Sequence, residues 1–383
     1  MNEFIPFARP TIGMAEIQAV NKILRQPILV HGKELDLFES EFARWVGAES
    51  AVAVSSCTAG LHLAYMALNI SRGDEVIVPA MTHVATAHAI EFVGAKPIFV
   101  DCELTYGNID ISKIERKITK KTKAISVVHY IGTAVNFNKL KNIAEKYNLR
   151  IIEDCALAFG TKYESKHAGL IGDIGVFSLY PVKHITSLEG GLIISKHSKY
   201  CEKIKLLRAF GVTKTHRERS PSAEYDVTEL GYNYRMNEVQ AAIGRIQLKK
   251  LNKILEIRKT NYALLTESLN NNDLFQQLKE LPPKTEASYY CKTVICTDNL
   301  KTNRNNVSTW LKNSGLGTSV YYPKPVPLLD YYKRKYGHEE SEFPNAATIA
   351  NKSIALPVGP HITQTSMALM IKLINSLRHE SFK

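Results

Sequence analysis

The fold of this 383-residue chain is decided by residues 153–191, EDCALAFGTKYESKHAGLIGDIGVFSLYPVKHITSLEGG. Two predicted strands, 150–154 and 175–179, end within this stretch. The first presents Asp154 at its end, and the second presents Ser178 and is followed by Lys183. In parallel sheets the groups that bind ligands collect just beyond the carboxyl ends of the strands. We therefore expect these three side chains to face one site.

On either side of this stretch, between residues 48 and 195, short β-branched runs alternate with helical segments. This alternation is typical of a mostly parallel sheet covered by helices. The predicted strands are 50–55, 75–78, 97–101, 123–130, 150–154, 175–179 and 191–195. The predicted helices are 59–68, 84–92, 110–118 and 138–147.

The pattern changes in the second half of the chain. Residues 237–270 keep a helical period without proline, which predicts a long helix connecting two domains. After Pro282 and Pro283 we expect a smaller α+β domain. Its predicted elements are a strand at 288–296, a helix at 304–313, a strand at 318–322 and a helix at 363–377. The polar segment 213–228 is predicted to be a mobile loop.

The totals restrict the class of protein. A chain of this length exceeds the size at which a single hydrophobic core usually stops growing, so two domains are expected. No apolar run suits a membrane span and the first residues do not resemble a secretory signal, which predicts a cytoplasmic protein. The six cysteines show no zinc spacing, so free thiols and no metal site are expected. The net charge of +12 is spread over predicted helical surfaces such as 112–123, 138–150 and 199–208, which argues against nucleic-acid binding.

The three side chains at the predicted site point to a cofactor. Pyridoxal-5′-phosphate (PLP) requires an amine that forms a Schiff base, a carboxylate that keeps its pyridine nitrogen protonated, and hydroxyls that help to hold its phosphate. Lys183, Asp154 and Ser178 supply these groups. Residues 52–64, VAVSSCTAGLHLA, add a strand that runs through small polar residues into a helix. Its helix start, with Ser56 and Thr58, is suited to an anion, although these residue types are also ordinary helix caps.

These residues resemble the DegT/DnrJ/EryC1/StrS family of sugar aminotransferases, and the resemblance covers nearly the whole chain. It rests on segments that occur in family order. They are PFARP (6–10), GDEVIVPAMT (73–82), GAKPIFVD (94–101), GYNYRM (231–236), FPNA (343–346) and LPV (356–358). The resemblance implies the aspartate-aminotransferase (fold type I) architecture. A large PLP-binding domain (1–250) with a mostly parallel, seven-stranded mixed sheet would precede a small C-terminal domain (251–383).

The resemblance also implies roles for single residues. Lys183 matches the Schiff-base lysine and Asp154 the partner of the pyridine nitrogen. Thr58, Ala59 and Ser178 match phosphate ligands, and Asn233 matches an asparagine that reaches the phosphate of the neighbouring subunit. His83 stands where family members place an aromatic ring against the cofactor, and a core histidine is the alternative. The implied assembly is a homodimer with its active sites at the subunit interface.

The implied activity is transfer of the amino group of L-glutamate to a keto or aldehyde sugar, with PLP as cofactor. The anionic acceptor is either a nucleotide-linked keto-deoxyhexose or an atypical sugar such as 8-oxo-octulosonate, for lipopolysaccharide, O-antigen or related amino-sugar biosynthesis. Two departures from the family pattern affect the site. Leu157 replaces a common glutamine, and Pro325-Val326-Pro327 lacks a common histidine. A PLP-dependent sugar dehydratase and a non-catalytic PLP-fold regulator are the alternatives, and the presence of Lys183 favours transamination.

Overall fold

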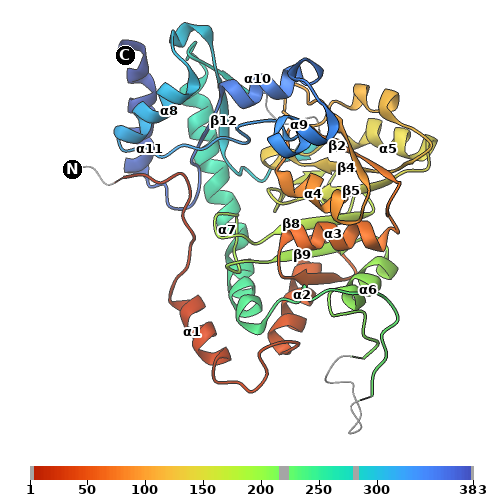
Figure 1. Cartoon of the computed structure of the whole chain (residues 1–383). Helices are drawn as coiled ribbons and strands as arrows, with labels where there is room; N and C mark the ends of the chain where they lie inside the picture. Colours follow the sequence, from red (N-terminus) through yellow and green to blue (C-terminus); the bar gives the residue numbers. More distant parts are fainter. Residues whose placement is uncertain (1–3, 215–223, 279–283, 381–383) are drawn as a thin grey trace.

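A computed structural model describes residues 4–214, 224–278 and 284–380 and contains one seven-stranded sheet (Figure 1). Its strand order is β1-β9-β8-β5-β4-β2-β3. Only β9 runs antiparallel to its neighbours, and the other pairs are parallel, so the predicted mixed sheet is confirmed. The strands are β1 (Ala51–Val54), β2 (Glu75–Pro79), β3 (Lys96–Val100), β4 (Thr122–Val128), β5 (Arg150–Asp154), β8 (Ile174–Ser178) and β9 (Gly191–Ser195).

Helices cover both faces of the sheet, and this explains why its strands are continuous apolar runs. Along β1, Val52 and Val54 pack on one side and Ala51 and Ala53 on the other. The first side carries α3 (Cys57–Ala67), α4 (Val84–Phe92) and α6 (Ser198–Leu207). The second side carries α2 (Lys33–Val46), α5 (Phe137–Lys146) and the first half of α7 (Glu238–Leu269).

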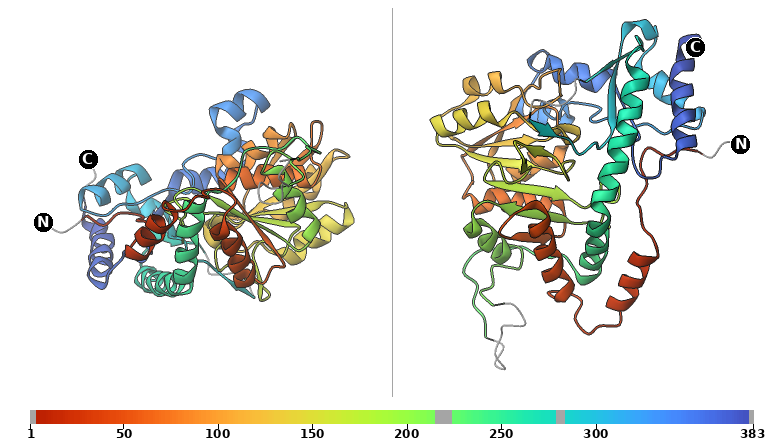
Figure 2. Two further views of the ribbon diagram at one scale, coloured as in Figure 1. Left: turned by 90° about the horizontal axis from the view of Figure 1, so that it is seen from below. Right: turned by 180° about the vertical axis from the view of Figure 1, so that it is seen from behind.

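Helix α7 extends from the large sheet into the C-terminal part of the chain (Figure 2). It begins with a capping box, in which Asn237 accepts the amide N–H of Gln240 and the Gln240 side chain accepts that of Asn237. Early in α7 the helix packs on α1 (Met14–Ile23) and α2, and Leu265 and Leu269 near its end join the C-terminal core. The predicted long helix is therefore confirmed, and the two domains that it would connect stay a prediction. The predicted domain boundary at residue 250 lies inside it and stays a prediction.

The C-terminal part is built on a second, antiparallel sheet. Its order is β10-β12-β13. Residues near the start of the chain pack in the same core, and Ile5 pairs with Leu316 in an isolated bridge outside this sheet. The elements are β10 (Phe275–Gln277), β12 (Lys292–Cys296), α8 (Arg304–Asn313), α9 (Asp330–Tyr336), α10 (Pro344–Lys352), β13 (Ser353–Leu356) and α11 (Gln364–Ser376). A third small sheet joins β6 (Lys162–Tyr163), β7 (Lys166–His167) and β11 (Thr285–Glu286).

Two predicted elements are wrong. Residues 110–118 form two short 3-10 turns, Ile111–Lys113 and Glu115–Lys117, where the Asp110 carboxylate binds the Ser112 amide and β-branched residues disfavour a longer helix. The segment 318–322 is not a strand, because only Ser319 pairs, with Ala355, before the chain turns toward the site described below. The predicted strand 288–296 is shorter than expected and begins at Lys292.

Two further predictions concern a polar loop and membrane-spanning helices. The predicted loop 213–228 lies partly outside the described residues, and its two sides meet where Val212 pairs with Val227. No helix within the described ranges has both the length and the apolar character needed to cross a bilayer.

Candidate active site

A cavity of about 640 Å³ opens at the carboxyl ends of β5 and β8. Six of the eight predicted site residues line it: Ser56, Thr58, His83, Asp154, Ser178 and Lys183. The other two, Ala59 and Asn233, are not among its lining residues. The cavity size is typical of sites for cofactors and small ligands. The sheet therefore brings together most of the residues that the sequence singled out.

Lys183 is half-buried in the turn that follows β8. Its Nζ lies 5.6 Å from the centre of the Tyr290 ring. Burial lowers the pKa of Lys183 below its usual value, although nearby Cys57 and Asp154 oppose this shift. Burial removes solvation that the charged amine needs and the neutral amine does not. The lysine is consequently a better nucleophile and base at neutral pH than a surface lysine.

Asp154, at the end of β5, is only 4% exposed and is held by two hydrogen bonds. Its Oδ1 accepts the amide N–H of Ala156 at 3.0 Å, and its Oδ2 accepts the hydroxyl of Thr86 at 2.8 Å. Thr86 lies on α4, one turn after His83. Thr86 was not among the residues predicted for the site.

The start of α3 forms the predicted anion-binding corner. Ser56 is the N-cap, and its Oγ accepts the amide of Ala59 at 3.0 Å, so these two predicted phosphate ligands bind one another. The amides of Cys57 and Thr58 precede the first helical hydrogen bond, which Gly60 makes to Ser56. Cys57 and Thr58 line the cavity. Their amides and the Thr58 hydroxyl lie at the start of α3, where the helix dipole favours an anion.

Aromatic side chains also line the cavity. His83 is the N-cap of α4, and its Nδ1 accepts the amide of Ala85 at 3.2 Å, so the ring hydrogen lies on Nε2. Burial lowers the pKa of His83, which favours the neutral ring. Its centre lies 5.7 Å from the Tyr322 ring. Tyr321 adds a second ring, whose hydroxyl lies 2.9 Å from that of Tyr290.

One of the two departures from the family pattern lines the cavity, and the other, at Pro325-Val326-Pro327, is not among its lining residues. The Leu157 side chain lines the cavity and is 3% exposed, and its carbonyl oxygen accepts the hydroxyl of Ser288. Pro327 lies in a buried 3-10 turn, Val326–Leu328, that binds the end of β2 through the amide of Val326 and the carbonyl of Ala80 at 2.9 Å. An apolar contact thus replaces a polar side chain at both positions.

Asn233 lies outside the cavity of this single chain. Its backbone pairs with Ala209, and its Oδ1 accepts the Nε hydrogen of Arg235 at 2.8 Å.

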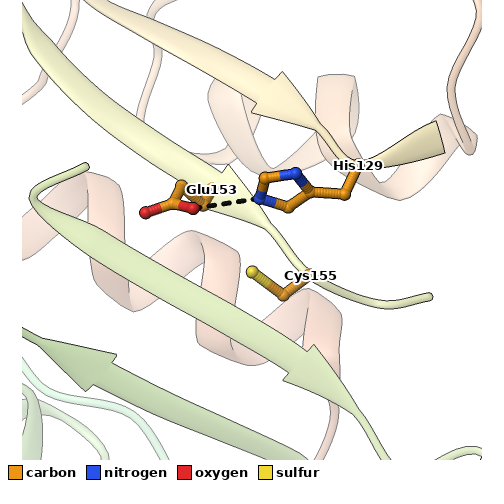
Figure 3. A group of neighbouring side chains, drawn as sticks. All are labelled: His129, Glu153 and Cys155. Carbon is orange, nitrogen blue, oxygen red and sulfur yellow. Dashed lines mark hydrogen bonds and ion pairs between the residues drawn. The ribbon is translucent and has the colours of Figure 1, made fainter. Parts of the chain in front are cut away.

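His129, Glu153 and Cys155 form a buried cluster of neighbouring side chains (Figure 3). His129 Nε2 is 2.9 Å from a Glu153 oxygen. Glu153 also accepts the amides of Gly169, Ile171 and Gly172. The protein itself therefore uses both carboxylate oxygens. This buried pair fixes the loop before β8 to the end of β5 and so holds the strand that carries Asp154.

Comparison with known proteins identifies the family. A sequence model of the DegT/DnrJ/EryC1/StrS aminotransferase family matches residues 10–375. The chain belongs to this family. The spore coat polysaccharide biosynthesis protein SpsC of Bacillus subtilis is 34% identical to it, over 98% of this chain and 97% of that protein. The UDP-4-amino-4,6-dideoxy-N-acetyl-beta-L-altrosamine transaminase of Campylobacter jejuni is 34% identical, over 92% of both.

The solved structures agree with this assignment. The putative sugar aminotransferase Spr1654 of Streptococcus pneumoniae in its pyridoxamine phosphate (PMP) form superposes with a TM-score of 0.92 at 27% identity, covering 98% of this chain and 99% of that one. Its PLP form gives 0.91. The DegT/DnrJ/EryC1/StrS member described here is thus a PLP-dependent sugar aminotransferase of amino-sugar biosynthesis with the predicted fold. The cavity suits PLP, since it offers a primary amine, a buried carboxylate and a free helix start.

Proposed function

We propose that this enzyme transfers the amino group of L-glutamate to a keto or aldehyde carbon of an anionic oxidised sugar, with Lys183 and Asp154 as its catalytic residues. The observation that carries the proposal is the shared cavity, in which a lysine of lowered pKa and a buried, hydrogen-bonded aspartate face the same space. Family membership favours this reaction over the dehydratase and over the non-catalytic regulator.

When bound, PLP supplies a reactive aldehyde and a ring that accepts electrons from the substrate carbon. Lys183 would hold the cofactor through its amine, and the same amine could move a proton to and from the substrate carbon. Asp154 would hold a proton on the ring nitrogen through ion pairing. His83 would contact the ring.

Phosphate binding is assigned to the start of α3 and to the end of β8. The amides of Cys57 and Thr58, with the hydroxyls of Thr58 and Ser178, offer donors to an anion. Ser56 and Ala59 act on this corner through their own hydrogen bond, which closes the first turn of the helix. Their direct contact with phosphate stays a prediction.

We further propose that two copies of the chain form a homodimer that shares its active sites. Large apolar side chains are exposed on α1 and on the segment just before Asn233, among them Met14 at 65% and Leu230 at 80%. Exposed apolar surface of this kind favours burial against a partner. A position near a subunit boundary also explains why Asn233 lies outside the cavity of its own chain.

Mixing two inactive variants tests the shared site. Lys183→Ala and Asn233→Ala would each lose activity alone. If the two residues belong to different subunits of one site, a one-to-one mixture allowed to exchange subunits regains up to about a quarter of wild-type activity, because heterodimers keep one intact site. An unchanged, inactive mixture with proven exchange would contradict the shared site.

The acceptor is proposed from relatives. The Campylobacter jejuni relative is named for a UDP-linked amino sugar, and the Helicobacter pylori aminotransferase PseC, 26% identical with a TM-score of 0.90, for pseudoaminic acid biosynthesis. The UDP-linked sugar in the first of these names favours a nucleotide-linked keto-deoxyhexose over 8-oxo-octulosonate. Use in lipopolysaccharide or O-antigen synthesis and a cytoplasmic location stay predictions of the sequence.

The deciding experiment combines one variant with a substrate panel. Wild-type enzyme and Lys183→Ala are incubated with glutamate and oxidised sugars of both types, and amino sugar and 2-oxoglutarate are quantified by mass spectrometry. Lys183→Ala should lose the visible band of lysine-bound cofactor and at least about 10²-fold in turnover. Exposed Lys146 serves as the matched control, since Lys146→Ala should change neither. Full turnover by Lys183→Ala would overturn the assignment.

A further inference from the structure

Two buried threonines lie four residues apart, one just before the N-cap of α4 and one in its first turn. Thr82 is 1% exposed and Thr86 is not exposed at all. Their hydroxyl oxygens are 2.7 Å apart, and the Thr86 hydroxyl lies 2.8 Å from Oδ2 of Asp154. The three side chains therefore form one continuous chain of hydrogen bonds that ends at the carboxylate.

The direction of this chain follows from the groups involved. An ionised carboxylate only accepts hydrogen bonds, so Thr86 must give its single hydroxyl hydrogen to Asp154. The hydroxyl of Thr86 can then only accept from Thr82, and Thr82 is the donor between the two. Consecutive hydrogen bonds of this kind polarise one another in a water-poor interior. Thr82 thus strengthens the bond that Thr86 makes to the carboxylate.

The two contacts of Asp154 come from different elements. The Ala156 amide follows β5 and holds Oδ1, whereas Thr86 belongs to α4 and holds Oδ2. A carboxylate held at both oxygens cannot rotate freely, so its remaining lone pairs keep a fixed direction. The same helix carries His83 at its N-cap. One helix therefore places both the ring against the cofactor face and the hydroxyl that orients the acid.

We propose that Thr86, backed by Thr82, is a positioning residue that orients Asp154 and stabilises its negative charge toward the ring nitrogen of the cofactor. The inference rests on the role proposed for Asp154. Removing the Thr86 hydroxyl would take the donor from one oxygen of this buried carboxylate, so Asp154 would stabilise a protonated ring nitrogen less well.

The test uses variants that separate the hydroxyl from the side-chain volume. Thr86→Val keeps the shape and removes the donor, and should weaken cofactor binding about tenfold in an absorbance titration. Thr86→Ser restores the hydroxyl and should bind within about twofold of wild type. Thr82→Val should give an intermediate loss. Thr293, which is 2% exposed on β12, provides the control for a buried threonine-to-valine change, and Thr293→Val should bind cofactor normally.

A second measurement, ¹⁵N NMR, reports whether the ring nitrogen of the cofactor is protonated. With cofactor labelled with ¹⁵N at the ring, the nitrogen resonance of Thr86→Val should shift toward the unprotonated form, while Thr86→Ser and Thr293→Val keep the wild-type value. A structural defect that only loosens the fold would leave the resonance of the bound fraction unchanged. An unchanged resonance in Thr86→Val overturns the inference.

Introducing Thr86→Val into the Asp154→Ala variant distinguishes a failure of this inference from a failure of the role proposed for Asp154. If Thr86 acts through Asp154, Thr86→Val causes no further loss of cofactor affinity in that background. A full additional loss shows that Thr86 acts by another route and overturns the inference. If Asp154→Ala itself leaves affinity and the nitrogen resonance unchanged, the proposed role of Asp154 fails, and the inference fails with it.

Discussion

Gly191→Ala should damage the cofactor site without touching any side chain that lines the cavity. Gly191 begins β9, next to β1, and its backbone lies against the start of α3. A β-carbon at this position would lie 2.6 Å from the carbonyl oxygen of Ser56 and 2.8 Å from the amide nitrogen of Cys57. These are backbone atoms, so no rotamer change relieves the contact.

The size of the effect follows from these distances. Carbon contacts are most favourable at about 3.5–4.0 Å, so the new methyl group has to displace the peptide by about 1 Å. Overpacking of this kind usually costs about 1–3 kcal/mol. Part of that cost falls on the amides of Cys57 and Thr58, which belong to the proposed phosphate corner. We expect the affinity for cofactor to fall about tenfold and the free energy of unfolding to fall by about 2 kcal/mol.

The assay compares cofactor titration with thermal unfolding for the cofactor-free and loaded protein. Gly13→Ala is the matched control, because the nearest atom to its β-carbon would be a carboxylate oxygen at 3.6 Å and its φ of −134° suits any residue. That variant should bind cofactor normally. The reasoning is refuted if Gly191→Ala binds cofactor as tightly as Gly13→Ala does.

Further predictions concern stability and pH. Burial lowers the pKa of His167 from 6.5 to about 4, so between these pH values the unfolded chain binds a proton that the folded one does not. The contribution of the neutral His167 ring to the free energy of unfolding is therefore fully present above pH 6.5 and is lost as the pH falls. Between pH 7 and pH 5 the free energy of unfolding should fall by about 2 kcal/mol. Urea unfolding at several pH values should show this loss in the wild type and not in His167→Gln. The same dependence of the unfolding free energy on pH in both proteins would contradict the prediction. Glu153→Gln places an amide group against backbone N–H donors and should cost about 3 kcal/mol in thermal unfolding, and a loss below about 1 kcal/mol would show that the buried carboxylate is not needed.

Much of the fold was predictable because its sheet is covered on both faces. Continuous apolar runs separated by helical periods then mark each strand, and the predicted bounds of β5, α4, β9 and α8 match the structure. Asp154 and Lys183 could be placed together for the same reason, since the ends of neighbouring parallel strands meet at one edge. The prediction failed at 110–118 and 318–322, where local capping and contacts with the site replace regular pairing.

The rest of the site could not be predicted from the sequence because it depends on contacts between distant segments. Thr86 is 68 residues from Asp154, and a threonine inside an apolar helix has no local feature that indicates a partner. Tyr290 and Tyr321 come from the C-terminal part of the chain, whose position against Lys183 only the tertiary structure shows. Thr82 precedes the N-cap of α4, so no helical spacing in the sequence connects it with Thr86 either.

The pairing of Ile5 with Leu316 has a consequence for synthesis on the ribosome. The Ile5 amide donates to the carbonyl of Gly315, and its carbonyl accepts from Gly317, each at 2.8 Å. At a typical rate of about 5–20 residues per second, the first residues wait roughly 15–60 s before these partners exist. During this interval Ile5 is a natural target for a chaperone or a protease. A nascent chain stalled before residue 315 should therefore be cleaved near its start far faster than the finished protein.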